Sequence, residues 1–170
     1  SFYESNGEYL LLANGLAERF AQDSGLALAN AFAVTGDDLR KLMVHHPFIN
    51  RESKVIFGTH VTLEAGTGIV HTAPGHGMED YLVGMEYGLD ILCPVDHQGR
   101  YTDEYADMKG VKVFDANDKV VDILKNNKKL IHSGKFEHSY PHCWRCRKPL
   151  IFRATEQWFL GVDRNNLRQV

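Results

Sequence analysis

The sequence predicts an α+β domain with a mainly antiparallel, β-barrel-like core and peripheral helices. Short apolar runs recur along the chain and outnumber the stretches with helical spacing. No regular alternation of strand and helix is visible, which argues against a parallel α/β sheet. The 170 residues suffice for one domain with a core of its own, alone or with a short appendage.

Seven short segments have the length and composition of strands. The first begins the chain at Phe2-Tyr3. The other six are residues 8–13, 31–35, 54–57, 68–72, 89–95 and 111–114.

Three stretches have the spacing of amphipathic helices. The first ends at Gly25, the second follows the loop 74–77, and the third begins at about Asp115, a suitable N-cap. The apolar faces expected to point inward are Leu16, Ala17, Phe20 and Ala21, then Tyr81, Leu82 and Met85, then Ala116, Val120, Val121 and Leu124.

Composition limits the class of protein. A net charge of -3 and a pI near 6.3 argue against a protein that mainly coats nucleic acid, although a local basic face is still allowed. No apolar run approaches the ~20 residues that span a bilayer, so no membrane partner is expected. Three cysteines do not form a disulfide framework, and we expect a reducing, cytoplasmic setting.

The character of the chain changes after Phe136, where prolines, both tryptophans and a cysteine pair gather. We therefore expect a main domain at 1–138 and a connecting segment at 139–170. Cys143-x-x-Cys146 has the spacing of a metal knuckle, and thiolates suit Zn²⁺, but the pair supplies only half of a four-ligand site. His138 and His142 are further candidates, whereas Cys93 is expected to be a buried apolar residue.

Residues 66–80, GTGIVHTAPGHGMED, predict a tight turn, a short strand, a loop and the start of a helix. His71 would end the strand and Asp80 would lie on the first helical turn, both facing one crevice. A carboxylate there can hold a substrate ammonium group, and an imidazole can bond to a hydroxyl or a water. From spacing alone, a structural role is the more frequent one: Asp80 favours a helix start, and His71 can be a satisfied half-buried histidine.

Two rival functions remain open at this point. His60, His71, His76 and Asp80 cluster in sequence, as in a metallohydrolase. The alternative is a zinc-ribbon-like RNA-binding module, suggested by the basic residues Lys125, Lys128, Lys129, Lys135, Arg145, Arg147 and Lys148.

The whole string GTGIVHTAPGHGMEDY closely resembles the signature of the editing domain of isoleucyl-tRNA synthetases, an insertion in these class I enzymes. Valyl enzymes usually carry Lys where His71 stands, and both valyl and leucyl enzymes prefer Ala-His-Asp where Gly75-His76-Gly77 stands. An editing domain of a valyl- or leucyl-tRNA synthetase is the alternative family assignment. Further matches cover nearly the whole chain, in the order of that family. They are residues 46–48, 57–62, 113–117, 138–141, 143–146 and 152–159.

The resemblance implies that the chain is a fragment of an isoleucine–tRNA ligase that hydrolyses Val-tRNA(Ile) after valine has been transferred to the tRNA. It leaves open whether the fragment also acts in editing before transfer. By motif match, Asp80 binds the α-ammonium of the aminoacyl group. His71 lines the pocket near the ester and the terminal ribose and limits side-chain size. The loop wall consists of Thr72, Ala73, Pro74, Gly75, His76, Gly77 and Met78.

The resemblance also implies partners and cofactors. The partners are the acceptor end of tRNA(Ile), carrying mischarged valine, and the rest of the parent synthetase. Editing needs no cofactor, and ATP and Mg²⁺ belong to the catalytic domain. In related synthetases an upstream cysteine pair completes the zinc knuckle, so Cys143 and Cys146 are expected to form an incomplete site.

One family feature is missing from the chain. A segment of the form Thr-Thr-Thr-Pro-Trp-Thr forms the opposite wall of the pocket and normally lies shortly before the strand at 8–13. Since the chain starts too late to include it, we expect this fragment to deacylate weakly or not at all.

Overall fold

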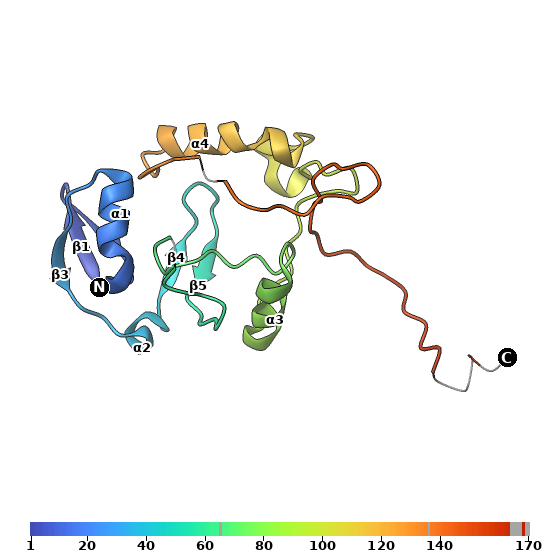
Figure 1. Cartoon of the computed structure of the whole chain (residues 1–170), viewed down its shortest axis with the longest axis horizontal. Coiled ribbons are helices and arrows are strands. Elements are labelled where there is room, and N and C mark those ends of the chain that lie inside the picture. Colours follow the sequence, from blue (N-terminus) through green and yellow to red (C-terminus); the bar gives the residue numbers. More distant parts are fainter. Residues whose placement is uncertain (65, 136, 164–167, 169–170) are drawn as a thin grey trace.

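The computed structural model of the chain has an α+β fold with two small antiparallel sheets (Figure 1). It describes residues 1–64, 66–135, 137–163 and 168. The strands are β1 (Phe2–Ser5), β2 (Glu8–Leu11), β3 (Ala29–Phe32), β4 (Met43–His45) and β5 (Glu52–Lys54). The α-helices are α1 (Ala17–Ser24), α2 (Gly36–Leu39), α3 (Met78–Tyr87) and α4 (Asn117–Asn126). The 3-10 segments are η1 (Asn14–Leu16), η2 (Asp103–Met108) and η3 (Val113–Asp115).

The first sheet has the order β2-β1-β3 and carries the clearest core. Asn6 and Gly7 both have positive φ, 53° and 83°, and they form the two-residue turn between β1 and β2. This is the type I′ geometry that Asn-Gly favours in hairpins. Behind the hairpin, Tyr3, Leu12 and Ala17 form a buried cluster, against which Leu10, Phe20 and Leu28 pack. The cluster explains why α1 lies against this sheet.

The predicted first helix is confirmed as α1. Gly25 adopts the left-handed conformation (φ 71°) at its C-cap, and its N–H donates to the carbonyl of Ala21 at 2.9 Å. A side chain there would be strained, which is why glycine is the usual residue at this position.

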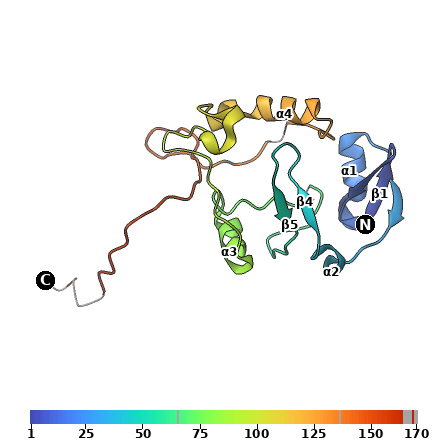
Figure 2. The same cartoon turned by 180° about the vertical axis from the view of Figure 1, so that it is seen from behind.

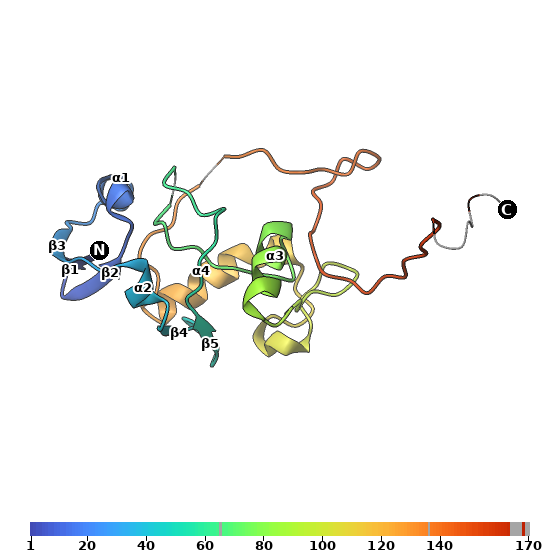
Figure 3. The same ribbon diagram turned by 90° about the horizontal axis from the view of Figure 1, so that it is seen from below.

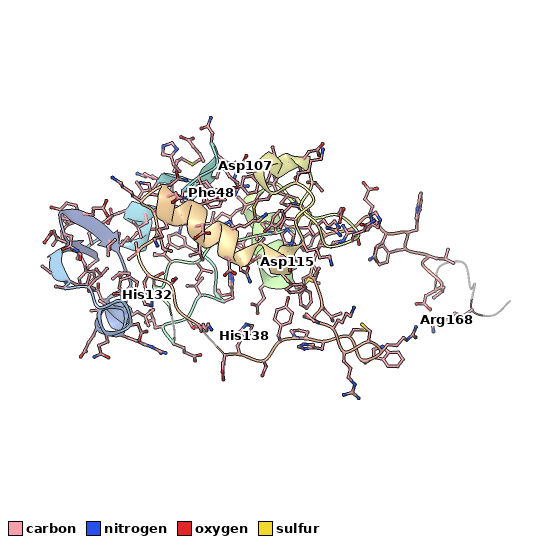
Figure 4. All side chains as sticks on the ribbon, turned by 90° about the horizontal axis from the view of Figure 1, so that it is seen from above. Phe48, Asp107, Asp115, His132, His138 and Arg168 are labelled. Atoms are coloured by element: carbon pink, nitrogen blue, oxygen red, sulfur yellow. The ribbon has the colours of Figure 1, made fainter. Side chains whose placement is uncertain are left out.

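The second sheet is the hairpin β4–β5. In its loop, Nδ1 of His46 accepts hydrogen bonds from the backbone N–H groups of Phe48 and Ile49, at 3.3 and 3.1 Å. Phe48, which Figure 4 labels, contacts Tyr105 of η2, and their ring centroids are 5.8 Å apart. The loop of the second sheet is thereby held against the middle of the chain.

The third predicted helix is confirmed as α4, which runs along one side of the molecule (Figure 2). Its expected apolar stripe does face inward: Ala116 is buried, and Val120, Val121 and Leu124 are half-buried. The predicted N-cap is wrong. Asp115 belongs to η3 (Figure 4), and Ala116 is the N-cap, without a side-chain hydrogen bond. The helix follows a 3-10 turn directly. Its first residues therefore lack the extended backbone conformation from which a capping side chain bonds to the helix N–H groups.

The barrel-like core is not found: the strands within the described ranges form two separate sheets and close no barrel. Of the predicted strands, 68–72 has no regular structure, while 89–95 and 111–114 contribute only the isolated bridges Val95↔Tyr101 and Arg100↔Lys112. The prediction also missed β4 and α2, which have only three and four residues. The division at 138/139 stays a prediction.

The position of helix α3 is predicted correctly, but the prediction that its apolar face is buried is wrong. Tyr81, Leu82 and Met85 are 36%, 61% and 57% exposed rather than turned into a core. Within the described residues no other helix or strand brings its backbone into close contact with α3. Spacing identifies the apolar face of a helix, but it does not show which part of a protein covers that face.

The chain exposes far more surface than a compact monomer of its mass. Its accessible surface is 13579 Å² for 19.3 kDa, whereas a compact monomer of this size exposes about 8,500 Å². The first sheet and the extended C-terminal segment lie at opposite ends of the molecule (Figures 1 and 3). Among the helices of the described chain, none has the length and hydropathy to cross a bilayer.

Leu12→Ala tests the core behind the first sheet. Because Leu12 is 3% exposed, the truncation leaves a cavity and should destabilise the sheet by about 2–5 kcal/mol. Leu63→Ala is the matched control, since Leu63 is 65% exposed. Hydrogen exchange at the β1 and β2 amides, followed by mass spectrometry, should accelerate only in the Leu12 variant. Equal exchange in both variants would contradict this core.

Candidate functional site

The Gly-Thr-Gly turn at the start of the 66–80 motif is attached to the end of the first sheet. The N–H of Ala13 donates to the carbonyl of Thr67 at 2.9 Å. Gly68 has φ 76°, and a Cβ there would lie 2.5 Å from the Cβ of Ala13. Both its conformation and this close approach therefore require glycine. The turn therefore anchors the start of the motif to the first sheet.

An open apolar cavity lies beside this turn. It measures about 350 Å³, and Leu12, Val34, Leu39, Leu63 and Ile69 are among the residues that line it. Of the motif as the structure describes it, Ile69 reaches the cavity, whereas residues 71–80 do not. The polar chemistry of the motif is therefore located elsewhere.

The loop before α3 is built around Gly75. This residue is buried, and a Cβ on it would overlap the carbonyl oxygen of Leu92 and lie 3.2 Å from the Cβ of Cys93. The close approach that this glycine permits is to the protein's own backbone. The carbonyl of Gly75 accepts a hydrogen bond from the N–H of Ala154 at 2.7 Å. Nδ1 of His76 lies 2.9 Å from the carbonyl oxygen of Phe152, to which it can only donate.

Asp80 lies in the first turn of α3 with its carboxylate turned back over the loop. Oδ2 accepts a hydrogen bond from the N–H of Ala73 at 3.0 Å. Oδ1 lies 3.6 Å from Nε2 of His60, which belongs to the turn 58–61. The two side chains are 23% and 17% exposed, so the pair is mostly shielded from water without being closed to it.

His71 occupies a different place from the one expected. It is exposed and close to His46, whose pKa is lowered by burial first, then by the charge of Arg51, and then by that of His71. No hydrogen bond or ion pair joins His71 to Asp80 in the part of the chain that the structure describes. The structure thus brings Asp80 together with His60 rather than with His71.

The remaining residues of the predicted loop wall differ in exposure. Thr72, Ala73 and Pro74 are half-buried, and Pro74 supports α3 because a Cβ on Gly84 would lie 2.6 Å from its Cγ. Gly77 is the extended N-cap of α3. Met78 is 73% exposed.

The cysteine pair forms a tight knuckle. The N–H of Cys143 donates to the carbonyl of Lys148, and the N–H of Arg147, a residue with φ 56°, donates to the carbonyl of Cys143, each at 2.8 Å. The pKa of the Cys143 thiol is lowered by the backbone N–H groups of Cys146 and Arg145 and by the Cys146 side chain. This turn favours the thiolate that binds metal.

The two histidines beside the knuckle do not complete it. Nδ1 of His142 lies 2.8 Å from the carbonyl oxygen of Tyr140, and Nδ1 of His138 lies 3.1 Å from that of Ser139. Within the described residues no three His, Cys, Asp or Glu side chains are grouped as metal ligands. His60, His71, His76 and Asp80, which a metallohydrolase site would use, are therefore not grouped in this way in the described part of the chain.

Known proteins similar in sequence to this chain come from the family that the motif resembles. An isoleucine–tRNA ligase from Fervidobacterium pennivorans is 51% identical to this chain over 161 residues, and one from Brachyspira hyodysenteriae is 50% identical over 167 residues. The corresponding protein of Geobacter sulfurreducens is 49% identical over 166 residues. These alignments cover 95%, 96% and 98% of the chain. No family model matches the sequence.

The chain is therefore part of an aminoacyl-tRNA synthetase sequence. It belongs to the isoleucyl-tRNA synthetase family, since identity near 50% extends over almost all of its residues. It spans 18% of the length of the curated relatives it matches.

Sequence reasoning missed the partner of Asp80. His60 stands 20 positions before Asp80, outside the motif, and the sequence pattern indicates it only as a metal ligand. The available signal was Gly58, two residues earlier, because a glycine beside a turn often marks a close approach by a side chain.

Gly75→Ala tests the crossing beneath the site. The new methyl group would meet the Leu92 backbone and should destabilise the loop by about 1–3 kcal/mol. Gly15→Ala is the control, since its Cβ would meet only Leu63, at 3.7 Å. Hydrogen exchange at residues 73–80 of the full-length synthetase should accelerate in the first variant alone. Unchanged exchange in Gly75→Ala would show that the crossing does not support the loop.

Proposed function

We propose that this chain supplies part of the editing site of an isoleucyl-tRNA synthetase, which hydrolyses Val-tRNA(Ile). The observation that carries the proposal is the fixed, partly exposed carboxylate of Asp80 at the mouth of the loop 72–78. The relatives support it because they are named isoleucine–tRNA ligases, enzymes of protein biosynthesis.

A second hydrolytic site meets a physical need in such an enzyme. A single missing methylene changes binding by only about 1–3 kcal/mol, and isoleucyl-tRNA synthetases are themselves the established example, with a selectivity of about 150-fold for isoleucine over valine. A smaller pocket that admits valine and excludes isoleucine sterically removes the product of this error.

Asp80 is suited to recognise the aminoacyl group. Its carboxylate stands in the first turn of α3, where the helix dipole favours negative charge. A charge-assisted hydrogen bond from the substrate's α-ammonium to this carboxylate would orient the ester. The loop wall 72–78 and His71 would then limit the size of the amino acid side chain.

The reaction is hydrolysis of an ester. Water attacks the carbonyl carbon, the bond from that carbon to the ribose oxygen breaks, and valine and a free terminal hydroxyl of the tRNA result. We assign no covalent nucleophile. Backbone groups of the loop and the neighbouring ribose hydroxyl of the tRNA would position the water.

The partners follow from the same proposal. The acceptor end of tRNA(Ile) carries the substrate. The rest of the synthetase would cover much of the excess exposed surface, including the apolar face of α3 with Met78, Leu82 and Met85. ATP and Mg²⁺ would serve the ligase reaction elsewhere in the whole protein, which we place in the cytoplasm.

Asp80→Asn in the full-length synthetase tests the proposed function. Loss of the charged acceptor should lower kcat/KM for hydrolysis of preformed Val-tRNA(Ile) about 10- to 150-fold, which corresponds to about 1.5–3 kcal/mol for a hydrogen bond to a charged group. Asp90→Asn, at an exposed position just after α3, is the control. Aminoacylation with isoleucine should be unchanged in both. Wild-type hydrolysis by Asp80→Asn would sink the proposed role of this carboxylate.

We further propose that Cys143 and Cys146 hold Zn²⁺ together with ligands from the rest of the synthetase. The knuckle and the lowered pKa of Cys143 support this proposal. Zn²⁺ would be structural and take no part in hydrolysis.

Metal analysis of the full-length synthetase tests the zinc proposal. Cys143→Ser should lower the zinc content by one equivalent per chain relative to wild type, because a structural site needs all of its thiolates. Cys93→Ser, which lies outside the knuckle, should keep the wild-type content. Equal zinc in wild type and Cys143→Ser would exclude this site.

A further inference from the structure

We propose that His60 is a positioning residue for the editing reaction: it fixes the carboxylate of Asp80 through Nε2 and Oδ1. The inference rests on the proposed function, in which Asp80 receives the α-ammonium of the aminoacyl group. It adds a second residue to that recognition, from a turn that lies outside the motif.

The first observation is a buried nitrogen. Nε2 of His60 is shielded from solvent and has no hydrogen-bond partner within the described residues. Buried N–H groups are rarely left unpaired. Oδ1 of Asp80 lies 3.6 Å away, just beyond hydrogen-bond distance, so a small rotation of either side chain pairs the two atoms.

The second observation is that the backbone has room for this ring. A Cβ on Gly58 would lie 2.5 Å from Cε1 and 2.7 Å from Nδ1 of His60. The N–H of Val61 donates to the carbonyl of Gly58 at 3.2 Å, which closes the turn around the ring. The imidazole is therefore packed against a residue without a side chain, with Nε2 directed at Asp80.

The third observation is that the two carboxylate oxygens have different neighbours. Oδ2 accepts from the N–H of Ala73, and Oδ1 faces His60. Once His60 donates to Oδ1, each oxygen has a donor and the plane of the carboxylate is fixed. The 23% of the side chain that remains exposed is then the part that can receive a substrate ammonium.

The test compares His60→Phe, which keeps a ring but removes the donor, with His60→Gln, whose amide can donate from the same distance. Both are made in the full-length synthetase, with His97→Phe, at an exposed loop position, as the control. Steady-state hydrolysis of Val-tRNA(Ile) gives kcat and KM for each. We expect His60→Phe to raise KM about tenfold with kcat within twofold, since ammonium binding contributes equally to ground and transition states. His60→Gln should stay within threefold of wild type.

A double variant separates positioning from general damage. If His60 acts through Asp80, His60→Phe combined with Asp80→Asn should be no slower than Asp80→Asn alone, because the two losses are not additive. Additive losses, or equal losses in the Phe and Gln variants, would overturn the inference. So would wild-type KM in His60→Phe while Asp80→Asn is impaired. Wild-type hydrolysis in Asp80→Asn would instead overturn the proposed function itself.

Discussion

The packing of Gly75 against the backbone of Leu92 is the constraint on which the candidate site depends. At this point three parts of the chain meet: the loop before α3, the segment at 92–93, and the C-terminal segment, which contributes the N–H of Ala154. A glycine is required because the neighbouring atoms are backbone and cannot rotate away. With the loop held there, the N–H of Ala73 and the start of α3 are fixed relative to each other, and the Asp80 carboxylate can bridge them.

The contacts of Asp80 differ from those usual for an acidic residue at a helix start. An aspartate in the first turn of a helix usually bonds to the N–H groups of that turn or simply stabilises the helix end. Asp80 reaches back across seven residues to Ala73 and presents its second oxygen to His60. The carboxylate is thus oriented by groups outside its helix, which is how a binding group is held in a fixed geometry.

Local signals in the sequence predicted local structure well. Asn6-Gly7 specifies the first hairpin, Gly25 ends α1, and the stripe through Val120 and Leu124 places the inner face of α4. The same reasoning failed where the outcome depends on distant partners. The apolar run 68–72 has strand composition, but within the described residues its backbone pairs with no other strand. The motif pointed to Asp80 as a candidate. Its proximity to His60 depends on how the turn 58–61 meets α3, which Gly58 alone does not indicate.

The contacts also separate two tasks within the proposed site. The groups that orient Asp80 belong to this chain: Ala73 and His60 lie beside it, and Gly75 holds the loop. The apolar surface around them is uncovered, with Met78 and Leu82 more than half exposed. A fixed carboxylate selects for an ammonium group but is indifferent to a methylene, whereas rejection of isoleucine needs a closed wall. In the proposed site, recognition of the charged group would therefore rest on residues of this chain. The loop wall 72–78 and His71 would need surfaces from the rest of the synthetase to close the wall that excludes isoleucine.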